Sequence, residues 1–240
     1  MDLSIVIPVK NEQENILPLL SEIHAVLEGR YDYEVIYVDD GSSDATVRVL
    51  EEGRTHYPRL RVLCHAHSYG QSTAVRSGVQ AARAAWIVTL DGDGQNDPAD
   101  IPKFMAVVEA PDCPPDLKLI AGWRKKRRDS WLKRISSKIA NTVRSVLLRD
   151  NTPDTGCGLK LFQRELYLEL PYFDHMHRFL PALVQRAGYQ VRSIEVHHRH
   201  RERGVSKYGL HNRLWVGIVD LLGVSWLQRR AQRPSIMEVE

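Results

Sequence analysis

Short apolar runs alternate along the first hundred residues with segments whose apolar residues recur at helical spacing. The runs predict strands, and the segments between them predict helices. The predicted strands are Leu3–Pro8, Glu34–Val38, Leu60–Cys64 and Trp86–Leu90, and the predicted helices are Glu14–Leu27, Ala45–Gly53 and Gln71–Ala84. This alternation favours an α/β fold: a Rossmann-like, doubly wound, mainly parallel sheet with helices on both faces.

Beyond residue 97 the pattern is less regular. It predicts a helix over Ile101–Glu109, a loop over Pro111–Pro115 and a fifth strand over Leu117–Ala121. Apolar residues also line one helical face of Trp131–Leu148, and Gln190–His198 is predicted as a strand. No internal repeat or flexible linker marks a second domain.

Polar clusters follow three of the predicted strands, at Pro8–Glu12, Asp39–Asp44 and Asp91–Gln95. In doubly wound sheets, ligands bind outside the carboxyl ends of the strands. The topology therefore predicts that these three clusters converge in space and form the functional site.

The cluster Asp91–Gln95 has the sequence Asp-Gly-Asp-Gly-Gln directly after a buried strand. Two carboxylates one residue apart, Asp91 and Asp93, can share a divalent cation, and Gln95 can add a neutral oxygen. Mg²⁺ takes few protein carboxylates and keeps positions open for substrate phosphates. The hypothesis is a metal–diphosphate site, and the alternative is a solvated acidic turn.

Asp39 and Asp40 end the second predicted strand and can accept hydrogen bonds from ribose hydroxyls or base N–H groups. The alternative is an acidic turn that caps the following helix, for which Asp44 and the neighbouring serines suffice. Neither a G-x-x-x-x-G-K-[ST] loop nor a G-x-G-x-x-G motif follows the first strand. A bound nucleotide would therefore be held by carboxylates and by metal-bound phosphate.

The net charge of +3 conceals an uneven distribution of basic residues. Seven of the eleven residues in Arg124–Arg134 are Lys or Arg, and Arg199–Arg203 forms a second basic cluster. Such clusters suit phosphates, anionic membrane surfaces or nucleic acid.

The three cysteines, Cys64, Cys113 and Cys157, are scattered, which favours a reducing compartment over a disulfide framework or zinc site. We find no signal peptide and no apolar window of about 20 residues that could span a bilayer. We therefore expect a cytoplasmic protein, either soluble or peripheral on the cytoplasmic face of a membrane.

Five motifs together resemble the inverting family 2 glycosyltransferases of GT-A fold. They are Ile5–Glu12 (IVIPVKNE), Val38–Asp44 (VDDGSSD), Asp91–Gln95 (DGDGQ), Asp154–Lys160 (DTGCGLK) and Arg203–Tyr208 (RGVSKY). The last two resemble the D-x-T-S-G-[FY]-[RK] and R-x-G-x-S-K-[YF] segments of the dolichyl- or polyprenyl-phosphate sugar synthases. The match runs in order from about Leu3 to Leu210. The chain departs from the subgroup at Gly94, which replaces an apolar residue, and at Cys157, which replaces a serine.

The resemblance implies transfer of a sugar, with inversion, from GDP-mannose or a UDP-sugar to the phosphate of a dolichol- or undecaprenol-type lipid. It implies Mg²⁺ or Mn²⁺ on Asp91, Asp93 and Gln95, and catalytic roles for Asp91, Asp93, Arg203 and Lys207. The implied nucleotide-sugar ligands are Pro8, Val9, Asn11, Glu12, Asp39, Asp40, Asp91, Gly92 and Asp93. The implied acceptor-phosphate ligands are Arg124, Arg134, Ser137 and Asp154. A lipid phosphate is already anionic near pH 7, so the site would need cations and positioning more than a general base.

The expected division of the chain is a catalytic domain over residues 1–210 and a C-terminal segment over 211–240. Ten large apolar residues lie within Leu214–Leu227, which is too short to span a bilayer and is flanked by Arg213 and by Arg229 and Arg230. An amphipathic helix in the membrane interface fits this segment, and so does a helix packed on the core. Where relatives continue into transmembrane helices, this chain can instead use a small membrane-anchoring protein as a partner.

Three other functions remain open from the sequence. A family 2 transferase acting on a glycan or lipopolysaccharide hydroxyl would need a carboxylate base, for which Asp154 is the best candidate. A nucleotidyltransferase should have a glycine- and lysine-rich loop after the first strand, which Pro8–Glu12 lacks. A basic membrane- or nucleic-acid-binding module without catalysis would explain Arg124–Arg134 but not the acidic strand ends, so we expect no nucleic-acid partner.

The histidines are expected to be structural or on the surface. Neighbours on a strand point to opposite faces, and no carboxylate pattern completes a metal site around them. They are His65, His67, His197, His198 and His200.

Overall fold

The computed structural model describes residues 1–125, 144, 147–200 and 210–232, and only the helical backbone of 210–216. The strands are β1 (Leu3–Val9), β2 (Tyr33–Asp39), β3 (Leu60–Cys64), β4 (Trp86–Thr89), β5 (Leu117–Trp123), β6 (Lys160–Gln163) and β7 (Gln190–Glu195). The helices are α1 (Ile16–Leu27), α2 (Thr46–His56), α3 (Gln71–Ala81), α4 (Ile101–Val108), α6 (Arg164–Glu169), α7 (Leu180–Arg186) and α8 (Leu210–Arg229). Two 3₁₀ turns, η1 (Pro98–Asp100) and η2 (Met176–Arg178), join them.

The seven strands form one sheet in the order β3-β2-β1-β4-β6-β5-β7. The first four of these are mutually parallel, and β5 and β7 are parallel to each other. Only β6 is antiparallel to its neighbours β4 and β5. The sheet is therefore mixed but mainly parallel, as the sequence pattern predicted.

Each face of the sheet carries its own hydrophobic core. On β1, Leu3, Ile5 and Ile7 pack with α1 and α4, whereas Val6 faces α3. A strand whose two faces are both covered is apolar at nearly every position. This is why the run Leu3–Val9 is continuous rather than alternating.

The early elements agree with their predicted positions to within a few residues, whereas the second half contains elements that the pattern missed. β6, α6 and α7 were not predicted, and β7 ends at Glu195 rather than at His198. β6 has only four residues and pairs with β4 some 70 positions earlier in the chain, which local periodicity cannot report. Most of the predicted helix Trp131–Leu148 lies outside the described residues, although Arg144, Leu147 and Leu148 are helical.

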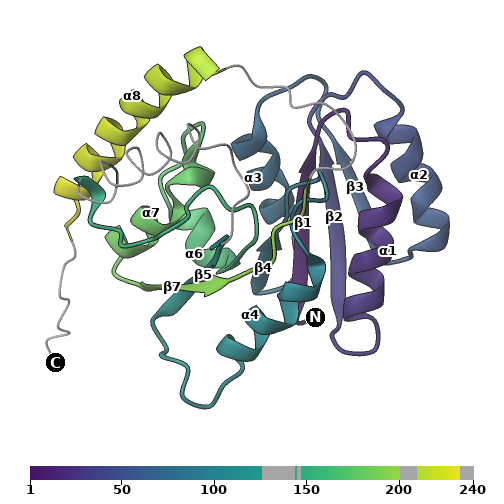
Figure 1. Ribbon diagram of the computed structural model, residues 1–240, viewed down its shortest axis with the longest axis horizontal. Coiled ribbons are helices and arrows are strands. Elements are labelled where there is room, and N and C mark those ends of the chain that lie inside the picture. The colour runs from purple at the N-terminus through teal and green to yellow at the C-terminus, as the bar shows by residue number, and fades with distance from the viewer. Residues whose placement is uncertain (126–143, 145–146, 201–209, 233–240) are drawn as a thin grey trace, which may run out of the picture.

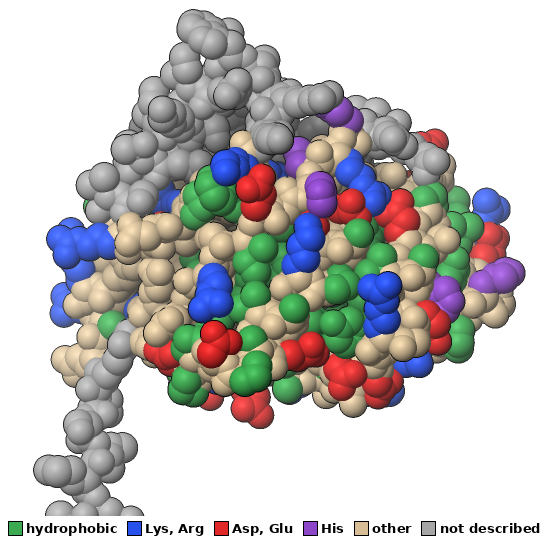
Figure 2. All heavy atoms as spheres, turned by 60° about the horizontal axis from the view of Figure 1, so that its bottom comes forward, with side chains coloured by type: hydrophobic (Ala, Val, Ile, Leu, Met, Phe, Trp, Pro, Cys, Tyr) green, Lys and Arg blue, Asp and Glu red, His purple; other side chains and the backbone are tan. Residues whose placement is uncertain are grey.

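α8 lies on the outer edge of the molecule beside α7 (Figure 1). Within the described ranges, no helix is both long and apolar enough to cross a membrane. On the face displayed in Figure 2, basic and acidic side chains are interspersed and apolar side chains lie between them. The expected boundary at residue 210 stays a prediction.

Candidate active site

The carboxyl ends of β2, β1 and β4 lie side by side, because β1 pairs with both other strands. At this edge Asp39 is opposite Val9, and the Asp40 amide donates to the Val9 carbonyl at 2.8 Å. The Leu90 amide donates to the Val6 carbonyl at 3.3 Å. The three polar clusters that follow the strands therefore converge, as the topology predicted.

The turn Asp91–Gln95 is held by its own polar groups. The Asp91 amide donates to Asn96 Oδ1 at 2.9 Å, and the Gln95 amide donates to Asp93 Oδ1 at 3.1 Å. Gly94 has φ of +75°, a conformation that glycine adopts without strain. An apolar residue, which is usual here in the subgroup that the chain resembles, would be strained in this backbone.

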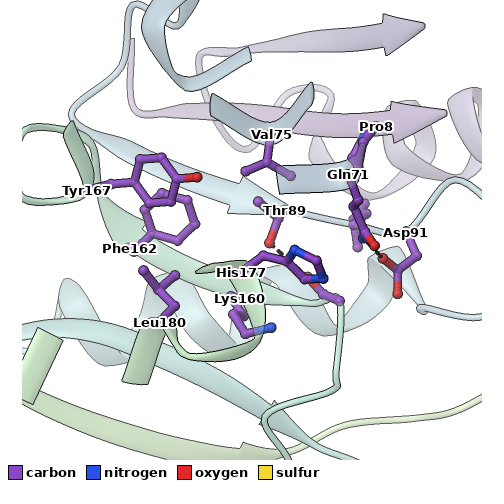
Figure 3. Close-up of a pocket in the computed structure, with 12 residues that line it drawn as sticks. Pro8, Gln71, Val75, Thr89, Asp91, Lys160, Phe162, Tyr167, His177 and Leu180 are labelled. Atoms are coloured by element: carbon purple, nitrogen blue, oxygen red, sulfur yellow. Dashed lines mark hydrogen bonds between the residues drawn. The ribbon is translucent and has the colours of Figure 1, made fainter. Parts of the chain in front are cut away.

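Asp91 lines a pocket at this edge of the sheet, which we call the cleft (Figure 3). Gln71 Nε2, at the start of α3, donates to Asp91 Oδ1 at 2.9 Å. Burial raises the pKa of Asp91, and the nearby charge of Asp93 raises it further. A bound cation would relieve both effects. Among the described residues no group of three or more His, Cys, Asp or Glu forms a metal cluster. Two carboxylates and an amide oxygen fit a cation that shares its remaining positions with substrate phosphate.

The segment after β1 is tied to the segment after β2. Asn11, at φ of +50°, accepts the Ser43 amide at 2.7 Å through its side chain and donates its own amide to Ser42 Oγ at 2.7 Å. The Glu12 amide donates to Thr46 Oγ1 at 2.9 Å. These bonds join two loops that are some 30 residues apart in sequence.

Asp39 and Asp40 have different surroundings, although they are neighbours. Asp39 accepts the amide and hydroxyl of Ser42 and so closes its own turn. Asp40 accepts four donors: His65 Nδ1 at 2.8 Å, Ser68 Oγ at 2.6 Å, and the amides of Tyr69 and Gly70 at 2.8 and 2.9 Å.

Burial opposes ionisation of Asp40, but these hydrogen bonds outweigh it and lower its pKa. Asp40 therefore holds residues 65–70 above the strand ends, and its carboxylate is already occupied. The ring of His65 bridges Asp40 and Ser77, which is the structural role expected for it.

Arg124 and Asp154, both expected at the acceptor phosphate, bind each other. Arg124 Nε and Nη2 donate to the two carboxylate oxygens of Asp154 at 2.6 and 2.8 Å. Asp154 is 5% exposed. Burial lowers the pKa of the Arg124 guanidinium, but the hydrogen bond to Asp154 outweighs this effect and raises it above its usual value. The pair ties the residue that follows β5 to the start of the Asp154–Lys160 segment.

Lys160 and His177 line the same pocket as Asp91, and neither was predicted as a site residue (Figure 3). Lys160 is 4% exposed and donates to the Cys157 carbonyl, and burial lowers its pKa. His177 Nδ1 lies 2.7 Å from Ser72 Oγ, and burial together with the nearby Lys160 charge lowers its pKa well below the usual value. Lys160 is the last residue of the family motif Asp154–Lys160, so the sequence contained a signal for it. The sequence around His177 contains no motif that would predict a site residue there.

The segment that precedes the basic motif Arg203–Tyr208 is anchored to the turn carrying Asp93. The Arg199 amide donates to the Gln95 carbonyl at 3.1 Å, and Asn96 forms a β-bridge with His198. Arg199 also donates to Glu22 and to Asp97, each at 2.6 Å. The predicted site residues Arg134, Ser137, Arg203 and Lys207 lie outside the described residues.

His197 and Cys157 have structural surroundings. The His197 amide and ring contact Asp100, at 2.6 and 3.0 Å. Cys157 is fully buried, and burial raises the pKa of its thiol. The side chain that replaces the subgroup's serine is therefore part of the core rather than of the cleft.

Comparison with known proteins agrees with this geometry. The model of the family "Glycosyl transferase family 2" matches residues 4–170, which include β1, β2, β4 and the turn Asp91–Gln95. The chain belongs to glycosyl transferase family 2, and the protein is a glycosyltransferase of α/β GT-A fold.

Two curated relatives and one solved structure are similar to the chain. The chain is 36% identical over 243 residues to "Dodecaprenyl-phosphate galacturonate synthase" of Rhizobium johnstonii, covering 98% of this chain and 70% of the relative. It is 32% identical over 207 residues to "Undecaprenyl-phosphate 4-deoxy-4-formamido-L-arabinose transferase" of Proteus mirabilis, covering 85% of this chain and 62% of the relative.

The solved structure is glucosyl-3-phosphoglycerate synthase from Mycobacterium tuberculosis in complex with Mn²⁺, UDP and glucosyl-3-phosphoglycerate. It superposes with a TM-score of 0.67 at 18% identity, covering 98% of this chain and 81% of that one. This likeness is one of fold.

Proposed function

We propose that the protein transfers a sugar from a nucleoside diphosphate sugar to the phosphate of a polyprenol, with inversion at the anomeric carbon. The observation that carries this proposal is the place of the turn Asp91–Gln95, which follows β4 at the edge where three adjacent strands end, with Asp91 lining a pocket there. The names of the two curated relatives, both polyprenyl-phosphate sugar enzymes, support the acceptor class.

In the proposed reaction, an oxygen of the acceptor phosphate forms a bond to the anomeric carbon while the bond to the donor diphosphate breaks. The nucleoside diphosphate leaves with the electron pair. A cation, Mg²⁺ or Mn²⁺, held by Asp91, Asp93 and Gln95 would neutralise the charge that develops on this leaving group. Gln71 orients the Asp91 carboxylate through its 2.9 Å hydrogen bond, so this carboxylate is positioned before substrate binds.

The state of Asp154 favours a phosphate acceptor over a glycan hydroxyl. A hydroxyl must lose a proton, so the alternative reaction needs a carboxylate base. Asp154 was the best candidate for that base, but both its oxygens accept from Arg124 and it is 5% exposed. A phosphate acceptor is already anionic and needs no such base.

Other parts of the cleft are proposed for nucleotide-sugar and acceptor binding. The residues that would contact the nucleotide sugar are Pro8, Val9, Asn11, Glu12, Asp39 and Gly92. The acceptor phosphate would meet Arg134 and Ser137, whereas Arg203 and Lys207 would close over the phosphates of the leaving diphosphate. Arg124, Asp154 and Asp40 contribute as positioning residues, since their charged groups are already paired. We infer peripheral attachment to the cytoplasmic face of a membrane, where the acceptor lies.

The test is a transfer assay that pairs a panel of donors with two acceptor classes. Donors are GDP-mannose, UDP-glucose and UDP-galacturonate, and acceptors are undecaprenyl phosphate and free glycans, each with Mg²⁺, with Mn²⁺ or with chelator. We expect a metal-dependent, organic-extractable product of inverted anomeric configuration with one donor, and none for Asp93→Ala. Transfer to glycans alone would overturn the proposed acceptor.

A further inference from the structure

An arginine-lined groove lies at the C-terminal end of α8, away from the catalytic cleft. It is bounded by the segment Leu147–Arg149, by the end of α7 and by α8, and its basic side chains are Arg149, Arg186 and Arg229. No acidic residue lines it within the described part of the chain. Arg149 and Arg229 form no ion pair with any described residue.

The groove is built by hydrogen bonds between its three walls. Gln228 of α8 donates to the Leu148 carbonyl at 3.0 Å, and Arg186 of α7 donates to the Leu227 carbonyl at 2.9 Å. Gln185 donates to the Asp150 carbonyl at 3.0 Å. Arg149 has φ of +53°, an uncommon conformation for a residue other than glycine. The hydrogen bonds hold the three walls of the groove together.

An exposed apolar ridge on α8 runs up to this groove. Ile218, Val219, Leu222 and Trp226 are 39%, 65%, 59% and 58% exposed. The opposite face packs on the protein through Val224, which is 1% exposed. α8 is thus apolar on both faces, and a helix that is apolar all round is normally buried. The outer face therefore needs an apolar environment of its own.

The ridge and the groove share one surface of α8. Residues three and four apart are neighbours on a helix. Leu222 therefore lies beside Trp226, and Trp226 lies beside Arg229 and Arg230. The Arg230 guanidinium lies 5.9 Å from the centre of the Trp226 ring. An apolar surface that ends in cations matches a bilayer, in which acyl chains lie beneath phosphate headgroups.

We propose that the groove binds the phosphate groups of anionic phospholipids while the ridge enters the bilayer interface, so that together they form a lipid-docking surface. None of the residues of this surface is among those proposed to bind the polyprenyl phosphate. It holds the enzyme on an anionic membrane whether or not donor and acceptor are present. The proposal does not depend on the sugar that is transferred.

The test is partition onto vesicles, measured by flotation without donor or acceptor. The vesicles contain phosphatidylcholine alone or with phosphatidylglycerol. We expect wild type to prefer the phosphatidylglycerol vesicles, and Arg149→Gln/Arg229→Gln to lose about fivefold in partition for each arginine removed. Val219→Ser/Leu222→Ser should lose at least about tenfold, because two large apolar contacts are removed.

The matched control is Arg48→Gln/Arg54→Gln, which removes two exposed charges from α2 on the far side of the molecule (Figure 1). It should partition as wild type does. The proposal is overturned if the groove variant also partitions like wild type, or if inorganic phosphate at equal ionic strength displaces the protein, which would indicate a site for free phosphate. Failure of every form to bind either vesicle would overturn it in favour of a protein partner. Circular dichroism checks that each variant is folded.

Discussion

Gly158 leaves no room for a side chain beside Asp91. A Cβ atom on Gly158 would lie 2.2 Å from Asp91 Oδ2 and 2.3 Å from its Cγ. The segment that follows Asp154 therefore passes directly against the carboxylate proposed to hold the cation. Because of this close contact, the DTGCGLK motif and the DGDGQ motif lie side by side, although Asp91 and Gly158 are more than 60 residues apart in sequence.

Gly158→Ala should displace Asp91 and so reduce transfer. A displacement of about 1 Å at a reacting centre can cost about 100-fold in rate. Transfer should fall by about this factor, with a stability loss of about 1–3 kcal/mol from overpacking. Steady-state kinetics and chemical denaturation measure the two effects. Gly217→Ala is the control, because a Cβ there has no neighbour within 4 Å, and a normal rate for Gly158→Ala would contradict the contact.

Asp91→Asn should stabilise the metal-free protein and abolish its response to metal. Folding raises the pKa of Asp91, so the ionised carboxylate destabilises the folded state. The free energy of unfolding therefore falls as the pH rises from the ordinary pKa of an aspartate towards the raised pKa of Asp91. At neutral pH the amide removes this cost.

The measurement for Asp91→Asn is thermal unfolding with and without Mn²⁺. We expect a higher midpoint without metal, by about 2–4 °C per kcal/mol gained, and no further rise when Mn²⁺ is added. Wild type should rise with Mn²⁺. An Mn²⁺-induced rise of equal size in both proteins would show that Asp91 is not a ligand.

Asp40→Asn should destabilise the protein at neutral pH by about 2–3 kcal/mol, since hydrogen bonds to a charged acceptor are lost. The pKa of Asp40 is lowered in the fold, so its stabilisation is present above the ordinary value of about 3.9 and is lost as the pH falls through the folded-state pKa. The difference between wild type and variant should therefore shrink in acid.

Urea unfolding at several pH values checks this expectation. Asp112→Asn serves as its control, because Asp112 is exposed and accepts no hydrogen bond in the described structure. A constant difference between wild type and Asp40→Asn across the acid range would exclude the ionised carboxylate as the source of the stabilisation.

Arg199→Lys should weaken cation binding without a large loss of stability. A lysine cannot contact Glu22 and Asp97 together, so the anchor of the turn that carries Asp93 is loosened. The Arg199 side chain is 39% exposed, so the lost ion pairs are worth about 1 kcal/mol. If this energy is lost from cation binding, the Mn²⁺ concentration for half-maximal activity rises about fivefold. The maximal rate at saturating metal should change little.

Titration of activity with Mn²⁺ measures this shift, and Arg192→Lys on the exposed part of β7 is the matched control. An unchanged Mn²⁺ requirement together with a lower maximal rate would show that Arg199 acts on something other than the cation.

The alternation of apolar runs and helical segments was sufficient to predict the early strands and helices and the convergence of their acidic ends. These features depend on residues close in sequence, because periodicity reports burial on the faces of one element. The motifs around Asp91 and Asp154 likewise identified the family from the sequence alone. That local information placed the three polar clusters at one edge of the sheet, where the structure brings them together.

Only the tertiary structure decided which charged groups at that edge are already paired. Asp40 and Asp154 are occupied by donors from residues 65–70 and from Arg124, whereas Asp91 stays at the floor of the cleft with its pKa raised. Lys160 and His177 come to Asp91 through an antiparallel strand and a 3₁₀ turn that no local pattern predicted. The physical reason is that the partners of a buried polar group are set by long-range packing, and sequence periodicity records only whether a position is buried.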